Sequence, residues 1–158
     1  MPQTIIVGID PGIHGAVAVL YENGPAVWDI PIVKDGKKFA IDPHELGHEL
    51  ATLPHGNVHV WVEKVWARQN ERPSSAFNFG RAYGTILGLC TALMLRHDLV
   101  TPAAWAKELA APTDDKARIA MAKRLYPTLN GEFELKTKAH HRADALLIAE
   151  YGKRKLGI

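Results

Sequence analysis

Three hydrophobic segments that lie far apart in the sequence each carry a carboxylate at or near one end. Asp10 closes the run 4–9, Glu63 closes the run 58–62, and Asp144 lies within the segment 140–149. A carboxylate beside buried apolar residues loses hydration energy, and it persists mainly where a cation or a hydrogen-bond donor compensates it. Three such groups brought together would raise each other's pKa values unless a cation lay between them. Oxygen clusters of this kind suit Mg²⁺ or Mn²⁺, which indicates metal-assisted chemistry on phosphate.

Each of these acidic residues also has an ordinary interpretation when it is taken alone. Asp10 begins Asp-Pro-Gly, a common turn sequence, and Glu63 could be a solvated strand end. His141 and Asp144 stand three residues apart, which places them on one helical face, where they could form a surface ion pair or cap a turn. The metal interpretation therefore depends on the combination of two strand-ending carboxylates with a terminal helix that presents His-x-x-Asp.

Length and composition predict one soluble globular domain over residues 1–158. The chain is 47% hydrophobic and 23% charged, which is ordinary for such a domain. Its single cysteine, Cys90, lies in an apolar run, so we expect a buried thiol and no intramolecular disulfide. No charged-then-apolar leader opens the chain, and the longest uncharged stretch, 82–95, is too short to span a membrane. These features predict a cytoplasmic protein without membrane association.

Charge is divided unevenly between the two halves of the chain. Residues 1–79 contain 6 Lys/Arg and 9 Asp/Glu, whereas residues 80–158 contain 13 and 8. A basic C-terminal half beside an acidic N-terminal half suits a protein that grips a polyanion with one part and binds metal with another. Solvated charged helices give a similar pattern.

Periodicity and turn residues predict strands first, then a strand–helix–strand crossover, then C-terminal helices. This order is typical of a mixed sheet flanked by helices. A turn at His55-Gly56-Asn57 leads into the fourth strand. The expected strands are 4–9, 15–20, 26–33, 58–63 and 99–101, and the expected helices are 43–53, 75–96, 102–109, 114–125 and 139–155.

The long helix predicted over 75–96 contains three glycines at four-residue spacing, Gly80, Gly84 and Gly88. Each interior glycine costs about 1 kcal/mol relative to alanine, so the row requires a reason. One explanation is close packing of the helix on the protein's own sheet. The other is a two-fold contact with a second copy of the chain.

Trp66 places a large indole before an otherwise polar segment, 67–75. It either folds back onto the core or stands exposed as a stacking platform for an unpaired base. Arg68 and Arg72 in the same segment would then contact phosphates. The other three tryptophans alternate with apolar neighbours and are expected in the core: Trp28, Trp61 and Trp105.

Five motifs occur in order along nearly the whole chain. They are Ile-Val-Gly-Ile-Asp-Pro-Gly at 6–12, Val-Glu-Lys-Val-Trp at 62–66, Gly-Arg-Ala-Tyr-Gly at 80–84, a basic stretch with Trp-Ala-Lys at 105–107 and Asp-Asp-Lys at 114–116, and His-Arg-Ala-Asp-Ala-Leu at 141–146. Together they resemble the motifs of the RuvC family of Holliday-junction resolvases, within the ribonuclease H-like superfamily. In that family the first residue of the last motif is Asp or His, and here it is His141, so the site lacks a fourth carboxylate. His140 and the loop 66–75 have no clear counterpart.

The resemblance implies an α/β fold, a ribonuclease H-like mixed five-stranded sheet flanked by helices. It also implies a homodimeric endodeoxyribonuclease that makes paired nicks in four-way or other branched DNA during recombination and repair. Trp66 would enter the junction, as the corresponding aromatic does in that family.

A metal centre is part of the same expectation. Two Mg²⁺ or Mn²⁺ ions about 4 Å apart would bridge the scissile phosphate, and imidazole tolerates Mn²⁺ better than Mg²⁺. Lys116, or else Lys107, would neutralise charge on the phosphoryl oxygens, although both could be ordinary solvated lysines. The implied metal ligands are Asp10, Glu63, His141 and Asp144.

Three other functions fit parts of the sequence. A ribonuclease H-type or RNA-processing nuclease of the same fold would need neither a dimer nor a wedge. A sugar-kinase-like ATPase also begins with strand–Asp–Gly–strand, but 158 residues leave no room for the second lobe that clamps a nucleotide. A non-catalytic DNA-binding module would have no use for buried carboxylates, so metal binding distinguishes it from the nucleases.

Overall fold

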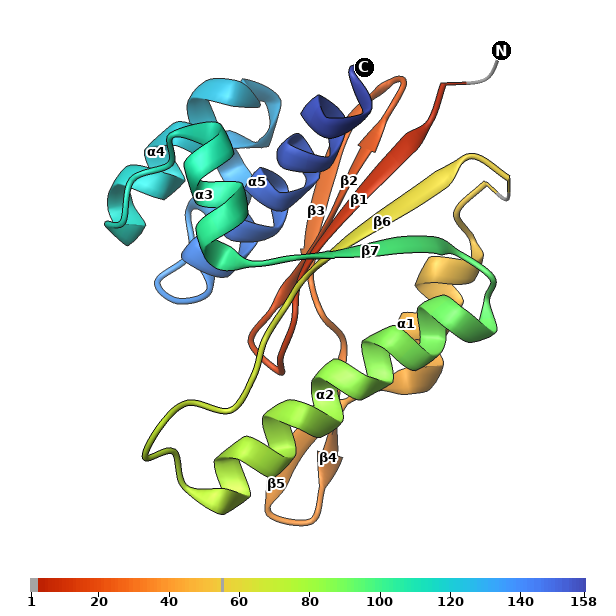
Figure 1. Ribbon diagram of the computed structural model, residues 1–158, viewed down its shortest axis with the longest axis vertical. Coiled ribbons are helices and arrows are strands. Elements are labelled where there is room, and N and C mark those ends of the chain that lie inside the picture. Colours follow the sequence, from red (N-terminus) through yellow and green to blue (C-terminus); the bar gives the residue numbers. More distant parts are fainter. Residues whose placement is uncertain (1–2, 55) are drawn as a thin grey trace.

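The computed structural model describes residues 3–54 and 56–158, which form one domain around a mixed five-stranded sheet (Figure 1). The strand order is β3-β2-β1-β6-β7. β1, β2 and β3 form an antiparallel meander, whereas β6 and β7 run parallel to β1. This is the predicted architecture, with the first and fourth predicted strands side by side. The strands are β1 Ile5–Asp10, β2 Ala16–Tyr21, β3 Gly24–Asp29, β6 Val58–Glu63 and β7 Arg96–Val100.

Helices cover both faces of the sheet, α1 and α2 on one side and α3, α4 and α5 on the other (Figure 1). A separate hairpin, β4 Ile32–Asp35 and β5 Lys38–Ile41, lies beside α2. The helices are α1 Pro43–Ala51, α2 Pro73–Ala92, α3 Pro102–Leu109, α4 Asp115–Leu125, the 3-10 helix Pro127–Phe133 and α5 Ala139–Leu156.

Local sequence explains where several helices begin. The Asp42 side chain accepts hydrogen bonds from two backbone amides at the start of α1, and Pro43 occupies the first helical position. The Thr101 and Asp114 side chains cap α3 and α4 in the same way. The N-terminal helix boundaries at 43, 102 and 114–115 are therefore those that the sequence predicts.

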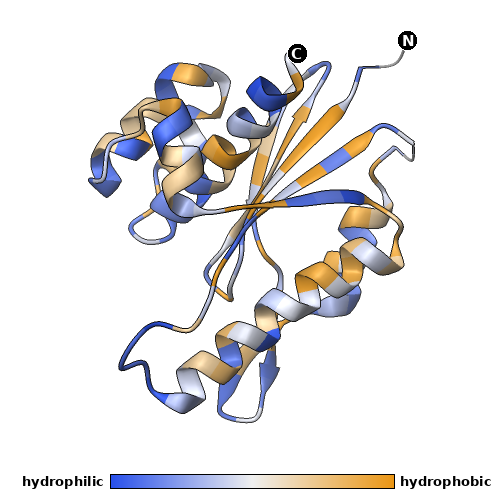
Figure 2. Ribbon diagram, in the orientation of Figure 1, coloured by the Kyte–Doolittle hydropathy of each residue, from blue (hydrophilic) through white to orange (hydrophobic). Residues whose placement is uncertain are grey.

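Apolar side chains of the central strands pack into cores on the two faces of the sheet. Val7, Ile9 and Val60 are buried against α1 and α2, whereas Ile6 and Ala18 pack against α5. Figure 2 shows that β1, at the centre of the sheet, is largely hydrophobic. Cys90 is buried in the α2 core, as predicted, and burial raises the pKa of its thiol to about 11. The three tryptophans predicted in the core do pack there. Trp105 is fully buried, whereas Trp28 and Trp61 are partly buried.

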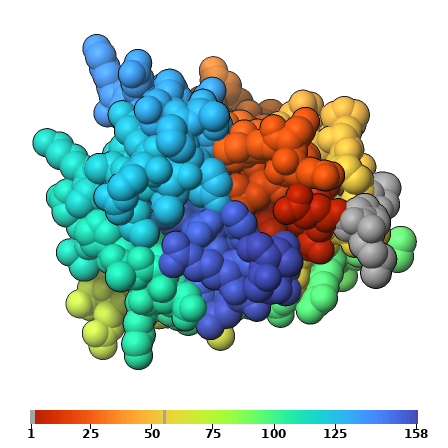
Figure 3. All heavy atoms as spheres, turned by 90° about the horizontal axis from the view of Figure 1, so that it is seen from above, coloured from red at the N-terminus to blue at the C-terminus, as the bar shows by residue number. Residues whose placement is uncertain are grey.

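Gly8 allows α5 to lie directly on β1. A Cβ at this position would overlap the backbone of Ala145 and Ala149, so no larger residue fits without moving the helix. Figure 3 shows the C-terminal end of α5 beside the first strands of the sheet. This close contact places the first turns of α5 over the end of β1. Among the described residues, no helix is long and apolar enough to cross a membrane.

The structure corrects several predicted boundaries. The single strand predicted over 26–33 is two strands, because the chain leaves the sheet after Asp29 and Pro31 precedes β4. The long helix ends at Ala92 rather than Arg96, because Met94 adopts a left-handed conformation with φ 54°. Arg96 instead begins the fifth strand, which therefore starts earlier than predicted. Of the predicted turn at 55–57, His55 lies outside the described residues.

Candidate active site

Asp10 and Glu63 lie together because they end two parallel, hydrogen-bonded strands. β1 and β6 pair with Ile9 opposite Val62, so the next residue on each strand is one of the two carboxylates. α5 then crosses this edge of the sheet and brings His141 and Asp144 to the same place. The four residues predicted as metal ligands thus line one cleft of about 500 Å³. Its lining also includes Pro11, Lys64, Val65, Trp66, Arg68, Phe79, Pro102, Asp115 and His140.

The Asp10 side chain is only 11% exposed and contacts the imidazole of His141. The distance from His141 Nδ1 to Asp10 Oδ2 is 2.7 Å. This hydrogen bond raises the pKa of His141, whereas burial and the neighbouring His141 charge lower the pKa of His140. His140 and His141 stack with ring centroids 4.0 Å apart. The charged form of His141 is thus favoured by its acidic neighbour.

Glu63 at the end of β6 and Asp144 on α5 each accept a hydrogen bond from a side chain on a neighbouring helix, α3 or α4. Trp105 Nε1 donates to Glu63 at 2.7 Å, and Arg118 Nε donates to Asp144 at 2.7 Å. Burial, followed by the charge of Asp10, raises the pKa of Glu63 to about 7. Burial likewise raises the pKa of Asp144 to about 6, although Arg118 opposes the shift. Such shifts are expected where desolvated carboxylates crowd together.

The donor set fits Mg²⁺ or Mn²⁺ in chemical type, since it offers three carboxylates and one imidazole. Within residues 3–54 and 56–158, however, no three His, Cys, Asp or Glu side chains stand in a ready metal-binding arrangement. Each carboxylate instead directs an oxygen at His141, Trp105 or Arg118. Binding an ion would require Asp144 to exchange its guanidinium partner and Glu63 to be deprotonated.

Arg118 is the residue of this site that the sequence analysis missed. Besides Asp144, it donates to Asp115 and to the backbone oxygen of Thr113, at 2.5 and 2.7 Å. Lys116, the predicted basic residue, is exposed and is not part of the cleft lining. The signal for Arg118 was its helical phase, because Met121 and Ala122, three and four residues later, are buried.

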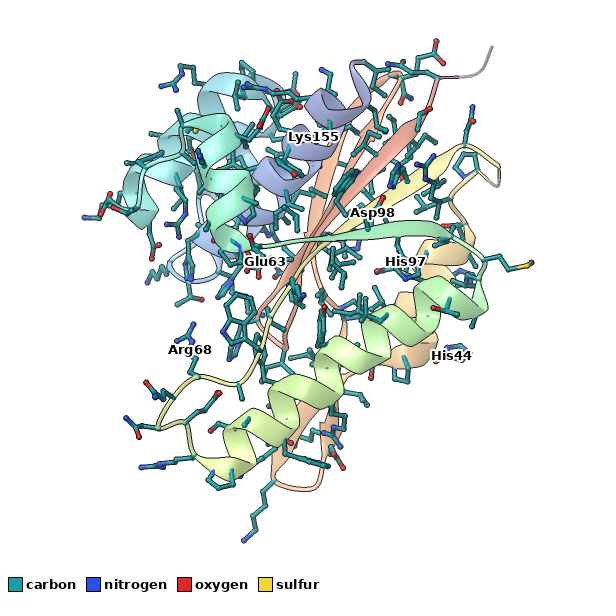
Figure 4. The ribbon with its side chains drawn as sticks, viewed as in Figure 1. His44, Glu63, Arg68, His97, Asp98 and Lys155 are labelled. Carbon is teal, nitrogen blue, oxygen red and sulfur yellow. The ribbon has the colours of Figure 1, made fainter. Side chains whose placement is uncertain are left out.

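The mouth of the cleft carries exposed aromatic and basic side chains. Trp66 is 62% exposed, so it does not fold back onto the core. Arg68 lines the cleft beside it, and Figure 4 shows Arg68 in the loop that follows Glu63. Arg72 immediately precedes α2 and is not a lining residue, nor is the exposed Lys107 on α3.

The glycine row of α2 faces outward. In the described part of the chain, a Cβ added at Gly80, Gly84 or Gly88 would meet no heavy atom within 4 Å. The residues of α2 that enter the core are Ala82, Ile86 and Cys90. The first explanation for the glycine row, close packing on the protein's own sheet, is therefore wrong. This face of α2 is not covered by other described parts of the chain.

Comparison with known proteins finds the same fold in solved structures. No protein-family model and no curated protein matches the chain. RuvC of Thermus thermophilus in complex with a Holliday junction substrate is 20% identical, with 98% of this chain and 97% of that chain aligned and a TM-score of 0.57.

Two further resolvases give similar alignments. The yeast mitochondrial Holliday junction resolvase is 19% identical, over 97% of this chain and 79% of that chain, with a TM-score of 0.57. The fowlpox virus Holliday junction resolvase is 16% identical, over 97% and 99%, with a TM-score of 0.51. The chain therefore shares the fold of these resolvases, and the predicted fold class, a mixed five-stranded sheet flanked by helices, is confirmed.

Proposed function

We propose that this protein is a metal-dependent, structure-selective endodeoxyribonuclease that resolves four-way or other branched DNA by paired nicks. The observation that carries the proposal is the convergence of Asp10, Glu63 and Asp144 in a cleft with an exposed Trp66 at its mouth. The fold shared with three Holliday junction resolvases supports it. Such an enzyme would act in recombination and repair, and we place it in the cytoplasm.

The four predicted ligands would hold two Mg²⁺ or Mn²⁺ ions, which supply an activated water and stabilise the leaving 3′ oxygen. Asp10 is the best candidate to contact both ions, since it bonds His141 and its charge raises the pKa values of both Glu63 and Asp144. Arg118 has a second role in this account, because its guanidinium can exchange Asp144 for a phosphoryl oxygen. Because Arg118 already bonds the candidate ligand Asp144, it replaces Lys116 as the favoured residue for neutralising charge on the scissile phosphate.

The exposed indole of Trp66 would stack on an unpaired base or wedge between base pairs at the crossover. Arg68 would contact phosphates beside it and would position the DNA without reading its sequence. These two residues favour branched DNA over a continuous RNA–DNA hybrid, which offers no unpaired base at its centre.

A homodimer would match the symmetry of a four-way junction, which offers two equivalent strands to two equivalent sites. The open face of α2 along Gly80, Gly84 and Gly88 is where we place the two-fold contact. Glycines at four-residue spacing allow two helices to approach closely, which would explain their retention on an exposed helix face.

The proposal is tested by incubating the protein with labelled four-way junction, linear duplex or RNA–DNA hybrid, each with Mg²⁺, Mn²⁺ or EDTA. We expect paired nicks in the junction with either metal and little cleavage of the other substrates. Preferential cleavage of the hybrid would favour the ribonuclease H-type alternative. Junction binding without cleavage under every condition would favour a non-catalytic module.

A further inference from the structure

A second hollow adjoins the candidate active site, and the two share a wall. This hollow, of about 460 Å³, lies between the hairpin β4–β5, the first half of α2 and the loop after β1. Phe79 lines both hollows, and the loop after β1 contributes Pro11 to the first and His14 to the second. A strand that leaves the active-site cleft past Phe79 would therefore reach the hairpin. The remaining lining residues are Ile13, Lys38, Phe39, Ser75, Asn78 and Ala82.

The hairpin presents a concentrated positive charge. Lys34, Lys37 and Lys38 are all exposed, and they are three of the 6 Lys/Arg in residues 1–79. The one acidic residue among them, Asp35, is bound by Arg81 of α2 at 2.8 Å. In the chain as described, no acidic side chain lies within 4.0 Å of these lysines to form an ion pair. Their charge is thus available to an external anion.

The hairpin is held at both of its ends. Its base is closed by a hydrogen bond from the Asp42 amide to the Pro31 oxygen, 2.9 Å, directly before α1. Near its tip, the Arg81–Asp35 ion pair ties it to α2. Gly36 takes a left-handed conformation with φ 63°, which closes a two-residue turn between Asp35 and Lys38. A fixed cationic surface of this kind suits a repetitive polyanion.

We infer that the hairpin 32–41 is a second DNA-binding element, which holds the duplex arm leaving the active-site cleft through phosphate contacts by Lys34, Lys37 and Lys38. This inference rests on the proposed function, because it names the part of a branched substrate that this surface contacts. The contacts are to the backbone, so they add affinity and orientation without sequence preference. The apolar floor at Phe39 and Phe79 supports the DNA-facing rim.

The first test compares two double variants with equal loss of charge. K34A/K37A removes hairpin charge, whereas K153A/K155A removes charge from the end of α5, at the opposite end of the molecule (Figure 1). We expect K34A/K37A to weaken junction binding about tenfold at roughly 0.1 M salt and to reduce the slope of log affinity against log salt by about 2. K153A/K155A should change both quantities much less, and it should leave junction nicking unchanged.

If both variants lost the same amount of junction affinity, only the net charge of the protein would matter, and the inference would be wrong. No loss in K34A/K37A would also contradict it, while leaving wild-type junction cleavage, and hence the proposed function, intact. If the wild type neither binds nor cleaves branched DNA, the proposed function itself fails, and the hairpin inference with it.

A second test locates the contact on the DNA. Cys90 is buried, with the pKa of its thiol raised to about 11, so a cysteine introduced by Lys37→Cys can be labelled selectively with a photocrosslinker. We expect crosslinks confined to one stretch of a duplex arm, away from the crossover. Crosslinks spread evenly over all arms, or formed only to a second protein chain, would overturn the assignment. A crosslinker introduced at Lys155→Cys supplies the matched control, with few DNA adducts expected.

Discussion

The floor of the cleft and its rim use charge in opposite ways. On the floor, Asp10, Glu63 and Asp144 are largely removed from solvent, and each is engaged by a proton donor. On the rim, Trp66 and Arg68 extend into solvent, and within the described residues the Arg68 guanidinium has no ion-pair partner. Buried charge that costs desolvation suits chemistry, whereas exposed charge suits reversible binding to phosphates. Catalysis and binding should therefore be separable by mutation.

The largest effect is expected on the floor. Asp10→Asn or Glu63→Gln removes metal-ligand charge, so junction nicking should fall about 1,000-fold or more, equivalent to several kcal/mol of transition-state stabilisation. Junction affinity, measured by gel shift in EDTA, should stay near that of the wild type. Glu108→Gln, an exposed carboxylate on α3, is the control and should cleave normally. Wild-type nicking rates in either floor variant would remove that residue from the site.

A smaller effect is expected for Trp66→Ala on the rim. Affinity should fall by no more than a stacking contact, roughly 1–3 kcal/mol, because Arg68 and the lysines still contact phosphates. Cleavage should fall further, since unstacking brings the scissile phosphate to the floor. A fluorescent base analogue at the junction centre should brighten with the wild type and with Trp66→Phe but stay quenched with Trp66→Ala. A bright probe and normal cutting in the alanine variant would exclude the wedge.

The open face of α2 is a third region to set beside the floor and the rim of the cleft. Its glycines stabilise neither the floor nor the fold, so substitutions there should act on self-association. Gly84→Leu should weaken self-association in sedimentation experiments, because bulk there would hold two copies apart. The folded monomer should tolerate Gly84→Ala and gain up to about 1 kcal/mol of stability, since nothing obstructs the added methyl. A wild type that stays monomeric at micromolar concentration, with and without junction, would leave the paired cut without a structural basis.

The smallest expected effect is the change with pH in the free energy of unfolding of the metal-free protein. Folding raises the pKa of Glu63 from 4.5 to about 7 and that of Asp144 from 3.8 to about 6. Their protonated forms therefore stabilise the fold fully below the unfolded pKa, and this stabilisation is lost as the pH rises through the folded values. The free energy of unfolding in EDTA should decline from about pH 5 to about pH 7.5. His141 contributes with the same sign.

Denaturant unfolding of Glu63→Gln isolates the contribution of that carboxyl, and its profile should be flatter than that of the wild type. Added Mg²⁺ should restore stability mainly at the upper end of the range, where the carboxylates are free to bind it. A wild-type unfolding free energy that rises with pH across this window would contradict the pKa shifts.

Much of the floor could be predicted from the sequence because it depends on strand ends. Asp10 and Glu63 terminate apolar runs whose pairing follows from the sheet order, and helical spacing joins His141 to Asp144. Arg118 was harder to predict, because its long side chain crosses from α4 to α5. Its helical phase places Arg118 on the same face of α4 as the buried Met121 and Ala122, but no local pattern records how far its side chain reaches.

The hairpin was not predicted and the orientation of the glycine row was left open, for different reasons. The strands of the hairpin 32–41 are four residues long, mostly exposed and rich in lysine, so they lack an alternating apolar pattern. The orientation of the α2 glycines is fixed by the opposite face of the helix, where Ala82, Ile86 and Cys90 enter the core. Because a buried and an exposed row of glycines would have the same four-residue spacing, the spacing alone does not tell which way the row faces.

The most direct test of the account is an order-of-addition experiment with the wild-type protein and a labelled four-way junction. The complex is formed in EDTA, its bound fraction is measured, and excess Mg²⁺ is then added while nicking is followed. We expect a stable, uncleaved complex in EDTA, because the rim binds without metal, and paired nicks after Mg²⁺ is added, because the floor requires it. Cleavage in EDTA, or loss of the complex on chelation, would contradict this division of roles.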